Sequence, residues 1–293
     1  MSTRHLVFII NQKAGVNRNK EIKTAVDAWI DSALYTTEIK YTTHAGHGTM
    51  LAREAAAAGA YAVAAVGGDG SVNDVAQGLL GTRTHLAIIP KGSGNGLARS
   101  LGIPLKTPAA IKALNKGHVE MTDVAFANNM PFISNAGVAF DALIAHKFAG
   151  SKRRGLLAYG WLVSKHLWLY KARHYEITAD GALRSEKAFM VVVANGRQFG
   201  YNFKIAPMAS HTDGLLDVII IRPFPKMAGL LISLRAVMGT IAKSRYVTHF
   251  KCKELTITHP KLEYMQKDGD ARKCGTHLKF TVQKAVLGII VPE

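Results

Sequence analysis

The 293-residue sequence contains little cysteine and no long apolar run. Its two cysteines, Cys252 and Cys274, are too few for a zinc ribbon or a disulfide framework, so a reduced, cytosolic setting is the simplest expectation. The longest uncharged stretch, residues 124–140, is interrupted by asparagines and a proline, and the apolar run after His5 has only the length of a strand. We therefore expect neither a membrane-spanning helix nor a secretory signal.

Acidic residues are also scarce, which gives the chain a formal net charge of +17. Residues 1–124 carry 13 lysines and arginines against 9 acidic residues, whereas residues 125–293 carry 24 against 11. A basic half of this kind attracts nucleic acid, anionic lipid or a polyphosphate substrate. Charge alone does not choose among these partners, and the excess can also serve solubility.

Apolar segments of strand length alternate with helical patterns through the first 124 residues. This alternation predicts an α/β architecture, a parallel sheet with helices on both faces. Ligands of such sheets bind beyond the carboxyl ends of the strands, where three glycine-bearing loops fall. The predicted strands cover residues 6–10, 37–42, 61–66 and 85–89, and the predicted helices cover 20–32, 48–59, 71–80 and 94–101.

Beyond residue 124 the pattern changes to many strands with few helices, which predicts an antiparallel β-sandwich. Helical stretches interrupt it at 152–171 and 226–245. We therefore expect an α/β nucleotide-binding domain over 1–124 and a β-rich domain over 125–293, with a return of the last strand to the first domain left open. The strands are predicted at 132–135, 174–178, 188–194, 216–222, 254–259, 278–283 and 288–291.

A glycine-rich loop with the sequence GGDGS, residues 67–71, follows a predicted strand and opens a helix. Glycines let the backbone approach a phosphate, and the amino end of a helix offers unpaired N–H groups. A carboxylate inside such a loop repels phosphate. Asp69 therefore orients a hydroxyl group, helps to hold magnesium, or is only an N-cap in a tight turn.

A second loop, residues 90–99, has the same layout of strand, glycines and helix. In it Ser93 offers a hydroxyl group and Lys91 a positive charge. Two such loops after neighbouring strands favour a phosphate-binding site over unrelated turns. The sequence contains no P-loop motif and no strand-linked dinucleotide fingerprint, which argues against a P-loop NTPase and a Rossmann NAD-binding domain.

Further motifs accompany the two loops in a fixed order. They lie at residues 43–48, 132–142, 151–159, 193–200, 206–218 and 266–270. This ordered set, which covers nearly the whole chain, resembles the diacylglycerol kinase and sphingosine kinase superfamily, and most of all its small two-domain bacterial lipid kinases. The GGDG element alone is shared with NAD kinases and phosphofructokinases, whereas the ordered set is specific.

The resemblance implies ATP as the phosphoryl donor and Mg²⁺ as the metal. Residues 11–15 match the family's phosphate loop, although Gln12 and Ala14 replace its usual proline and serine. Gly96 stands where bacterial members usually carry an aspartate, as in the sphingosine kinase form, so the lipid acceptor and the metal geometry stay open. The residues implied in ATP binding are Asn11, Gln12, Lys13, Ala14, Gly15, Thr43, Gly67, Gly68, Asp69, Gly70, Ser71, Val72, Asn73, Ser93 and Asn95.

The resemblance also implies metal-binding and catalytic residues. Ser210, Asp213 and the carbonyl group of Leu215 match a magnesium site in the second domain. Asp268 matches the proposed proton acceptor, with Asp270 as its rival. Asp69 joins them as a catalytic candidate from the first glycine loop.

The stretch 147–175 interleaves basic residues with Trp161 and Trp168. Such a mixture is typical of a segment at a membrane interface, but a core-packed helix with a solvated basic face gives the same pattern. In the first case we expect Lys152, Arg153 and Arg154 to contribute to docking on anionic lipid.

The sequence as a whole predicts an ATP- and Mg²⁺-dependent kinase that phosphorylates a lipid hydroxyl group in phospholipid metabolism. We expect a cytoplasmic protein, peripheral to the inner face of the membrane, whose partners are a membrane lipid and an anionic membrane surface. We expect no nucleic-acid partner, and a homodimer is left open. The alternatives are an NAD kinase and a non-catalytic basic module that binds nucleic acid or membrane.

Overall fold

The computed structural model describes residues 3–11, 16–151 and 156–293. The chain divides into two compact units. Unit 1 comprises Met1–Thr122 together with Ala285–Glu293, and unit 2 comprises Asp123–Lys284. The division falls two residues before the boundary expected from the sequence, and the last nine residues belong to unit 1.

Unit 1 contains a parallel sheet with the strand order β2–β1–β3–β4. Strands β1, β3 and β4 are buried along nearly their whole length, as expected for a parallel sheet that is covered on both faces. The predicted parallel sheet is therefore confirmed. Its strands are β1 (Arg4–Asn11), β2 (Tyr35–Thr42), β3 (Ala62–Gly67) and β4 (His85–Pro90).

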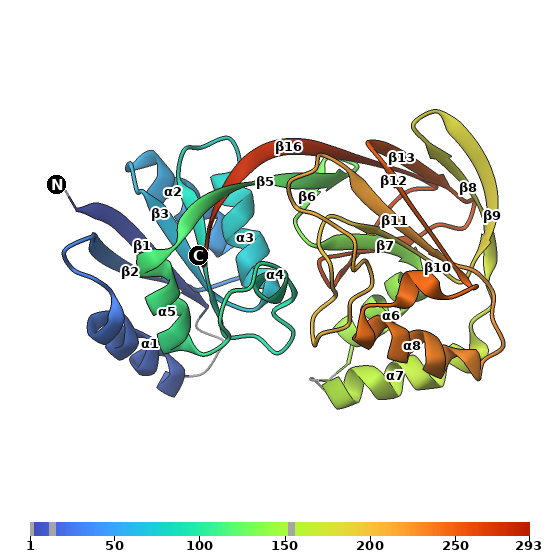
Figure 1. Cartoon of the computed structure of the whole chain (residues 1–293), viewed down its shortest axis with the longest axis horizontal. Helices are drawn as coiled ribbons and strands as arrows, with labels where there is room; N and C mark the ends of the chain where they lie inside the picture. The colour runs from blue at the N-terminus through green and yellow to red at the C-terminus, as the bar shows by residue number, and fades with distance from the viewer. Residues whose placement is uncertain (1–2, 12–15, 152–155) are drawn as a thin grey trace. The chain divides into compact units, whose positions relative to one another are not determined.

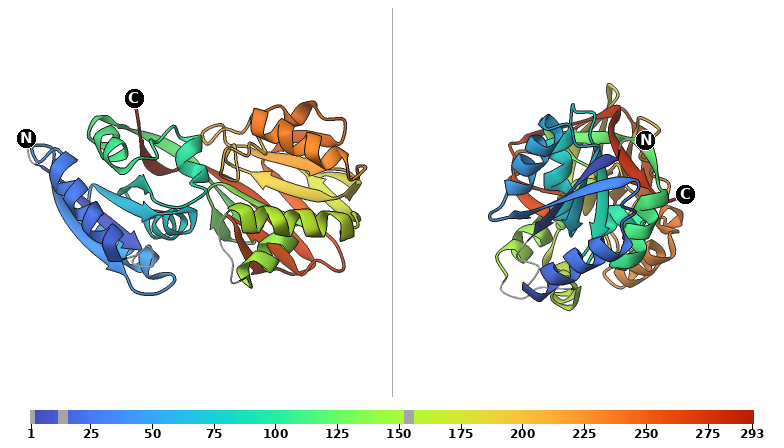
Figure 2. Two further views of the ribbon diagram at one scale, coloured as in Figure 1. Left: turned by 90° about the horizontal axis from the view of Figure 1, so that it is seen from below. Right: turned by 90° about the vertical axis from the view of Figure 1, so that its left-hand side faces the viewer.

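The helices of unit 1 pack in two pairs, α1 with α5 and α2 with α3. Figure 2 shows the two pairs on opposite faces of the sheet. Val72, Val75 and Leu79 bury one face of α3, as their helical spacing predicts. The helices are α1 (Val16–Trp29), α2 (His47–Ala57), α3 (Asp69–Leu79), α4 (Gly96–Ser100) and α5 (Thr107–Lys116).

Strand β16 (His277–Val291) contributes to both units. Its first half pairs antiparallel with β13 in unit 2, and near its end Ile289 pairs with Leu86 of β4 in unit 1. The sequence predicts two strands here, at 278–283 and 288–291. The structure has one, because residues 284–287 contain no glycine or proline that would end it.

Unit 2 is a β-sandwich, as predicted. One sheet has the order β12–β11–β10–β7–β14–β15, and the facing strands β16, β13, β8 and β9 form an antiparallel series. Val191 and Leu216 of the first sheet share a buried core with Ile257 and Phe280 of the second. The strands are β6 (Met130–Phe132), β7 (Asn135–Ala139), β8 (Arg173–Ala179), β9 (Ala182–Ala188), β10 (Met190–Ala194), β11 (Leu216–Ile221), β12 (Val247–Cys252), β13 (Glu254–Thr258), β14 (Tyr264–Lys267) and β15 (Asp270–Lys273). Strand β5 (His118–Ala127) begins in unit 1 and pairs with β6 in unit 2.

The six-stranded sheet β12–β11–β10–β7–β14–β15, called the β12–β15 sheet below, has three helices on its other face, as Figure 1 shows. They are α6 (Phe140–Ala149), α7 (Leu156–Leu169) and α8 (Ala228–Met238). Val192 and Ile219 point to this side and pack with Phe140 and Ile232 in a second core. Helices α7 and α8 correspond to the two predicted helical stretches, whereas α6 is not predicted. Among the described residues, no helix is long and apolar enough to cross a membrane.

Candidate active site

The candidate nucleotide-binding loops of unit 1 follow the carboxyl ends of four neighbouring strands. Asn11 ends β1, Thr43 follows β2, Gly67 ends β3 and Lys91 follows β4. Because the strands are parallel, these residues lie along one edge of the sheet, the usual position for a ligand. The remaining residues of the first loop, Gln12, Lys13, Ala14 and Gly15, lie outside the described residues.

The two glycine-rich loops pack backbone against backbone. The Lys91 N–H donates to the Gly67 carbonyl oxygen at 2.8 Å. A β-carbon at Gly92 would lie 2.5 Å from the α-carbon of Gly68, closer than real contacts allow. The Asn95 side chain closes the second loop, since it accepts from the Gly92 N–H at 3.0 Å and donates to the Gly92 carbonyl at 2.8 Å.

Asp69 connects the two loops. It is the first residue of α3, but its Oδ1 atom accepts from the Leu97 N–H at the start of α4, at 3.4 Å. Burial raises the pKa of Asp69, while the N–H groups of residues 95–97 act in the opposite direction. Asp69 thus contacts the start of the neighbouring helix rather than capping its own, and its role toward a metal or an acceptor hydroxyl stays a prediction.

The other predicted ATP-binding residues of unit 1 differ in their hydrogen bonds and in their exposure to solvent. Asn11 Nδ2 donates to Ser71 Oγ at 3.3 Å, which joins the first loop to the GGDGS loop. The Thr43 hydroxyl lies 3.0 Å from Nδ1 of His47. Ser93 and Gly70 are exposed, whereas Val72 and Asn73 are buried, so the Val72 side chain serves the core rather than a ligand.

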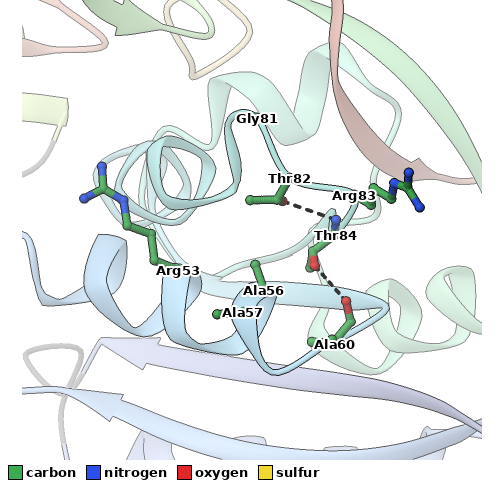
Figure 3. A pocket seen from close by; sticks show the side chains of 9 residues that line it. Arg53, Ala56, Ala57, Ala60, Gly81, Thr82, Arg83 and Thr84 are labelled. Carbon is green, nitrogen blue, oxygen red and sulfur yellow. Dashed lines mark hydrogen bonds between the residues drawn. The ribbon is translucent and has the colours of Figure 1, made fainter.

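A hollow of about 540 Å³ lies at the opposite edge of this sheet (Figure 3). It is lined by the turn before β3 and the turn before β4, which include Gly59, Ala60 and Thr84. The Thr84 hydroxyl donates to the Ala60 carbonyl at 2.7 Å and holds the two turns together. Because the hollow lies at the amino ends of the strands, it is separate from the glycine-rich loops.

In unit 2, Asp268 occupies the tight turn between β14 and β15. Asp268 and Gly269 both have positive φ angles, of 47° and 89°, as a two-residue type I′ hairpin requires. Its carboxylate turns back toward residues 133–135. There Oδ1 accepts from the Ser134 and Asn135 N–H groups at 2.8 and 3.1 Å, and Oδ2 accepts from the Ile133 N–H at 3.1 Å.

Asp268 and Asp270 differ sharply in their surroundings. Burial raises the pKa of Asp268 to about 6, although the three N–H groups and Lys267 favour the charged form. Asp270 is exposed and lies 3.5 Å from the equally exposed Arg272. A carboxyl group with a pKa close to neutral suits proton transfer, so the environment favours Asp268 over its rival.

Asn195 connects the Asp268 cradle to the 206–218 loop. Its Nδ2 atom donates to the carbonyl oxygens of Ile133 and Asp123, each at 2.9 Å. The buried Asp123 in turn accepts from the Gly214 N–H at 2.6 Å. Asn195 lies in the motif at 193–200, but the sequence does not predict its role, because its partners are more than 60 residues away.

Asp141 is a second carboxyl group that the sequence analysis did not single out. It is buried at the start of α6, and its Oδ2 atom makes no hydrogen bond within the described part of unit 2. Gly137 is required beside it, because a β-carbon there would overlap this oxygen. Burial raises the pKa of Asp141 well above its ordinary value, against the Ala142 N–H and the Gln266 side chain.

The predicted magnesium ligands lie together in one loop, but Lys251 already neutralises their only carboxylate. Lys251 Nζ lies 2.6 Å from Asp213 Oδ2, and Asp213 Oδ1 accepts from the Leu215 N–H at 3.1 Å. The Ser210 hydroxyl lies 3.2 Å from that of Thr212. A magnesium ion at this carboxylate would have to displace the ammonium group, so the residues as arranged do not fit the metal.

Comparison with known proteins agrees with this architecture. Residues 5–127 match the diacylglycerol kinase catalytic domain, and residues 134–291 match the YegS C-terminal NAD kinase beta sandwich-like domain. A "Probable lipid kinase YegS-like" protein of Chromohalobacter salexigens is 32% identical over 75% of this chain and 72% of its own length. The "Diacylglycerol kinase" of Bacillus subtilis is 28% identical over 90% of this chain and 88% of its own.

Solved structures share the fold. One titled as a diacylglycerol kinase from Bacillus anthracis has a TM-score of 0.74 at 24% identity and covers 98% of this chain and 96% of its own. An NAD kinase from Archaeoglobus fulgidus, solved in complex with ATP, has a TM-score of 0.54 at 14% identity and covers 99% of this chain and 94% of its own. The NAD kinase is thus a distant neighbour in fold.

The fold and the site together define a two-domain kinase. More particularly, the chain belongs to the YegS-like lipid kinase family, with a diacylglycerol kinase catalytic domain followed by a YegS C-terminal domain. The family expected from the motifs of the sequence is therefore confirmed.

Proposed function

We propose that this protein transfers the γ-phosphoryl group of ATP to a hydroxyl group of a membrane lipid. The observation that carries the proposal is the Asp268 carboxylate, held by three backbone N–H groups with a pKa raised to about 6. The paired glycine loops of unit 1 support it, because close-packed glycine backbone after the carboxyl ends of parallel strands is suited to phosphate. Residue roles within ATP binding stay predictions.

Asp268 would act as the proton acceptor. As the lipid oxygen forms its bond to the γ-phosphorus, the bond from this phosphorus to the β–γ bridging oxygen breaks. The hydroxyl proton passes to Asp268, and ADP leaves. The three N–H groups fix the carboxylate in one orientation, which suits a group that accepts a proton from the acceptor hydroxyl.

Magnesium would accompany the ATP phosphates, whose charge it neutralises in phosphoryl transfer. This differs from the site implied by the family resemblance at Ser210, Asp213 and Leu215. There Lys251 supplies the positive charge. We therefore assign the Asp213 loop a structural role and route no step of the reaction through it.

Asp141 would contribute to recognition of the lipid headgroup. The Gln266 side chain donates to Asn135 Oδ1 at 2.7 Å, and Asn135 is one of the residues whose N–H holds Asp268. Gln266 also interacts with the Asp141 carboxyl group. This buried carboxyl oxygen has no hydrogen bond within the described residues, and a headgroup hydroxyl would supply one.

One incubation tests the proposal against its alternatives. The full chain is given labelled ATP, Mg²⁺ and separate pools of diacylglycerol, phosphatidylglycerol, sphingoid base and NAD. We expect label in a lipid pool, its loss in Asp268→Asn, and its retention in Asp270→Asn. Label in NAD alone would support an NAD kinase. No label in any pool, with salt-sensitive binding of nucleic acid or membrane, would support a non-catalytic module.

The same proposal includes a place of action. A lipid acceptor lies in a bilayer, so we propose that the protein works in the cytoplasm against the inner face of the membrane, with anionic lipid as its partner and no nucleic-acid partner. The net charge of +17 supports attraction to such a surface. A homodimer stays an open prediction.

A further inference from the structure

The outward face of α8 is apolar, which is unusual for a surface helix. Its inward residues Ile232 and Ala236 are buried in the core over the β12–β15 sheet. The opposite side of such a helix normally carries charged residues. Here it carries large apolar side chains instead, and Leu230 is 78% exposed. The others are Leu231, Leu234, Val237 and Met238.

Helix α7 extends this apolar face. The two helices lie side by side (Figure 1). A β-carbon on Gly229 would lie 3.3 Å from a methyl group of Leu167, and Lys226 Nζ donates to the Tyr170 carbonyl at 3.1 Å. The exposed side chains of α7 are also large, and Trp168 is 63% exposed. The other exposed members are Leu157, Tyr159, Trp161 and Leu169. We call the exposed apolar side chains of both helices the α7–α8 surface.

The chain around this surface carries positive charge only. Residues 142–175, which include α7, contain no aspartate or glutamate and seven lysines or arginines. Residues 218–253, which include α8, likewise contain no acidic residue and seven basic ones. On α7 itself, Lys165 Nζ lies 5.2 Å from the centre of the Trp161 ring. Apolar and cationic side chains are thus combined in the same two segments.

We propose that the α7–α8 surface docks onto an anionic lipid bilayer. Leucine side chains would enter the acyl boundary, tryptophans would lie at headgroup level, and lysines and arginines would face anionic headgroups. A second copy of the chain is a poorer occupant, because two surfaces of the same positive charge would repel each other. The proposal rests on the proposed function, since a lipid kinase must reach an acceptor in a bilayer.

The surface differs from the docking segment expected from the sequence. Lys152, Arg153 and Arg154, which the sequence analysis assigned to docking, lie outside the described residues. The new element is α8, whose apolar outward face is apparent only once its inward face has been identified. The proposal therefore places the apolar contacts on both helices rather than on the basic cluster.

Co-sedimentation of the full chain with vesicles tests the docking. We expect binding to phosphatidylcholine vesicles that contain phosphatidylglycerol, and weaker binding without the anionic lipid or at high salt. The double substitution Leu230→Ser and Leu234→Ser should lower partition about tenfold or more. The matched control is Leu183→Ser, because Leu183 on β9 is 69% exposed but lies outside the α7–α8 surface. Thermal melts verify that both variants are folded.

Tryptophan fluorescence identifies the face that meets the lipid. The chain has three tryptophans, of which Trp161 and Trp168 lie on α7 and Trp29 lies on α1 in unit 1. Brominated acyl chains should quench the emission of the unsubstituted protein. The substitutions Trp161→Phe and Trp168→Phe should leave an emission that the same vesicles do not quench.

Turnover assays distinguish a failure of the docking surface from a failure of the proposed kinase function. The Leu230→Ser, Leu234→Ser variant should lose turnover of vesicle-borne lipid but keep turnover of a short-chain, water-soluble acceptor. Unchanged vesicle binding in this variant, or an equal loss in Leu183→Ser, would overturn the docking surface. So would a dimer that this variant dissociates while vesicle binding is unchanged. A protein that docks as described but phosphorylates no lipid would support the docking surface and refute the kinase proposal.

Discussion

The ammonium group of Lys251 lies 2.6 Å from Asp213 Oδ2 and 3.5 Å from Asp217 Oδ2. Asp217 is fully buried, and its Oδ1 atom is 2.6 Å from His249 Nε2. Burial acts to lower the pKa of Lys251, but the two aspartates outweigh it, so the net pKa is raised. Lys251, although exposed, therefore ties the Asp213 loop to strands β11 and β12.

This ion pair predicts that the wild-type fold does not depend on magnesium. In Lys251→Met the ammonium is lost while the aliphatic stem remains, so Asp213, Ser210 and the Leu215 carbonyl become available to a metal. We expect the free energy of unfolding to fall by about 1–3 kcal/mol, because a buried carboxylate loses a partner. Thermal melts without nucleotide should show that Mg²⁺ restores part of this loss in the variant only.

The control for this prediction is Lys253→Met, because Lys253 is exposed two residues along the same chain segment. Its melting temperature should match that of the wild type with and without Mg²⁺. A wild-type melting temperature that rises with Mg²⁺, with no rise in Asp213→Asn, would show that the metal binds beside Lys251 after all.

The raised pKa of Asp268 predicts a pH profile. If Asp268 accepts the proton, kcat/KM should fall as the pH drops below about 6, because the carboxyl group is then protonated. Asp268→Asn should lower kcat by at least about 100-fold, since general base catalysis contributes about that much. Its single amide oxygen can accept from the Ser134 and Asn135 N–H groups, but the Ile133 N–H group then loses its acceptor, so the free energy of unfolding should also fall by about 1–3 kcal/mol at neutral pH. An unshifted profile with full turnover in this variant would exclude Asp268 as the base.

The close packing of the two glycine loops predicts a loss of stability when Gly92 is substituted. In Gly92→Ala the new β-carbon meets the Gly68 backbone, which cannot move without separating the loops. We expect a loss of about 1–3 kcal/mol in the free energy of unfolding, and weaker ATP binding. The matched control is Gly70→Ala, because a β-carbon at Gly70 has no neighbour within 4 Å and no positive φ to oppose it. Denaturant titration of both variants measures the difference, and equal stabilities would refute the close packing of the loops.

The parallel sheet was predictable because its signals are local. Strands β1, β3 and β4 are short apolar runs, and burial on both faces produces that composition. The edge strand β2 is exposed or half-buried beyond Tyr35, and only its alternating pattern predicts it. Helix α6 was not predictable in the same way. Phe140, Ile144 and Ala145 are all buried along with Asp141, so α6 lacks the polar face that marks a surface helix.

Only those parts of the site that are continuous segments of the sequence were predictable. The glycine loops are continuous segments, and their positions after strands followed from the pattern. The cradle of Asp268 depends on hydrogen bonds to residues 133–135, more than 130 positions away. Similarly, Lys251 reaches Asp213 across 38 residues. No spacing rule in the sequence reveals these contacts, which arise from the pairing of strands in unit 2.

The last prediction concerns Asp141. Its folded pKa lies well above the unfolded value, so the folded state binds a proton that the unfolded state releases as the pH rises. The wild type should therefore lose stability as the pH rises from the unfolded pKa, near 4, through the folded pKa. Asp141→Asn keeps the shape of the side chain but has no proton to lose. Denaturant titrations from pH 4 to 8 should show that the free energy of unfolding of Asp141→Asn increases relative to that of the wild type as the pH rises. The same pH dependence in both proteins would mean that Asp141 has an ordinary pKa and a neutralising partner.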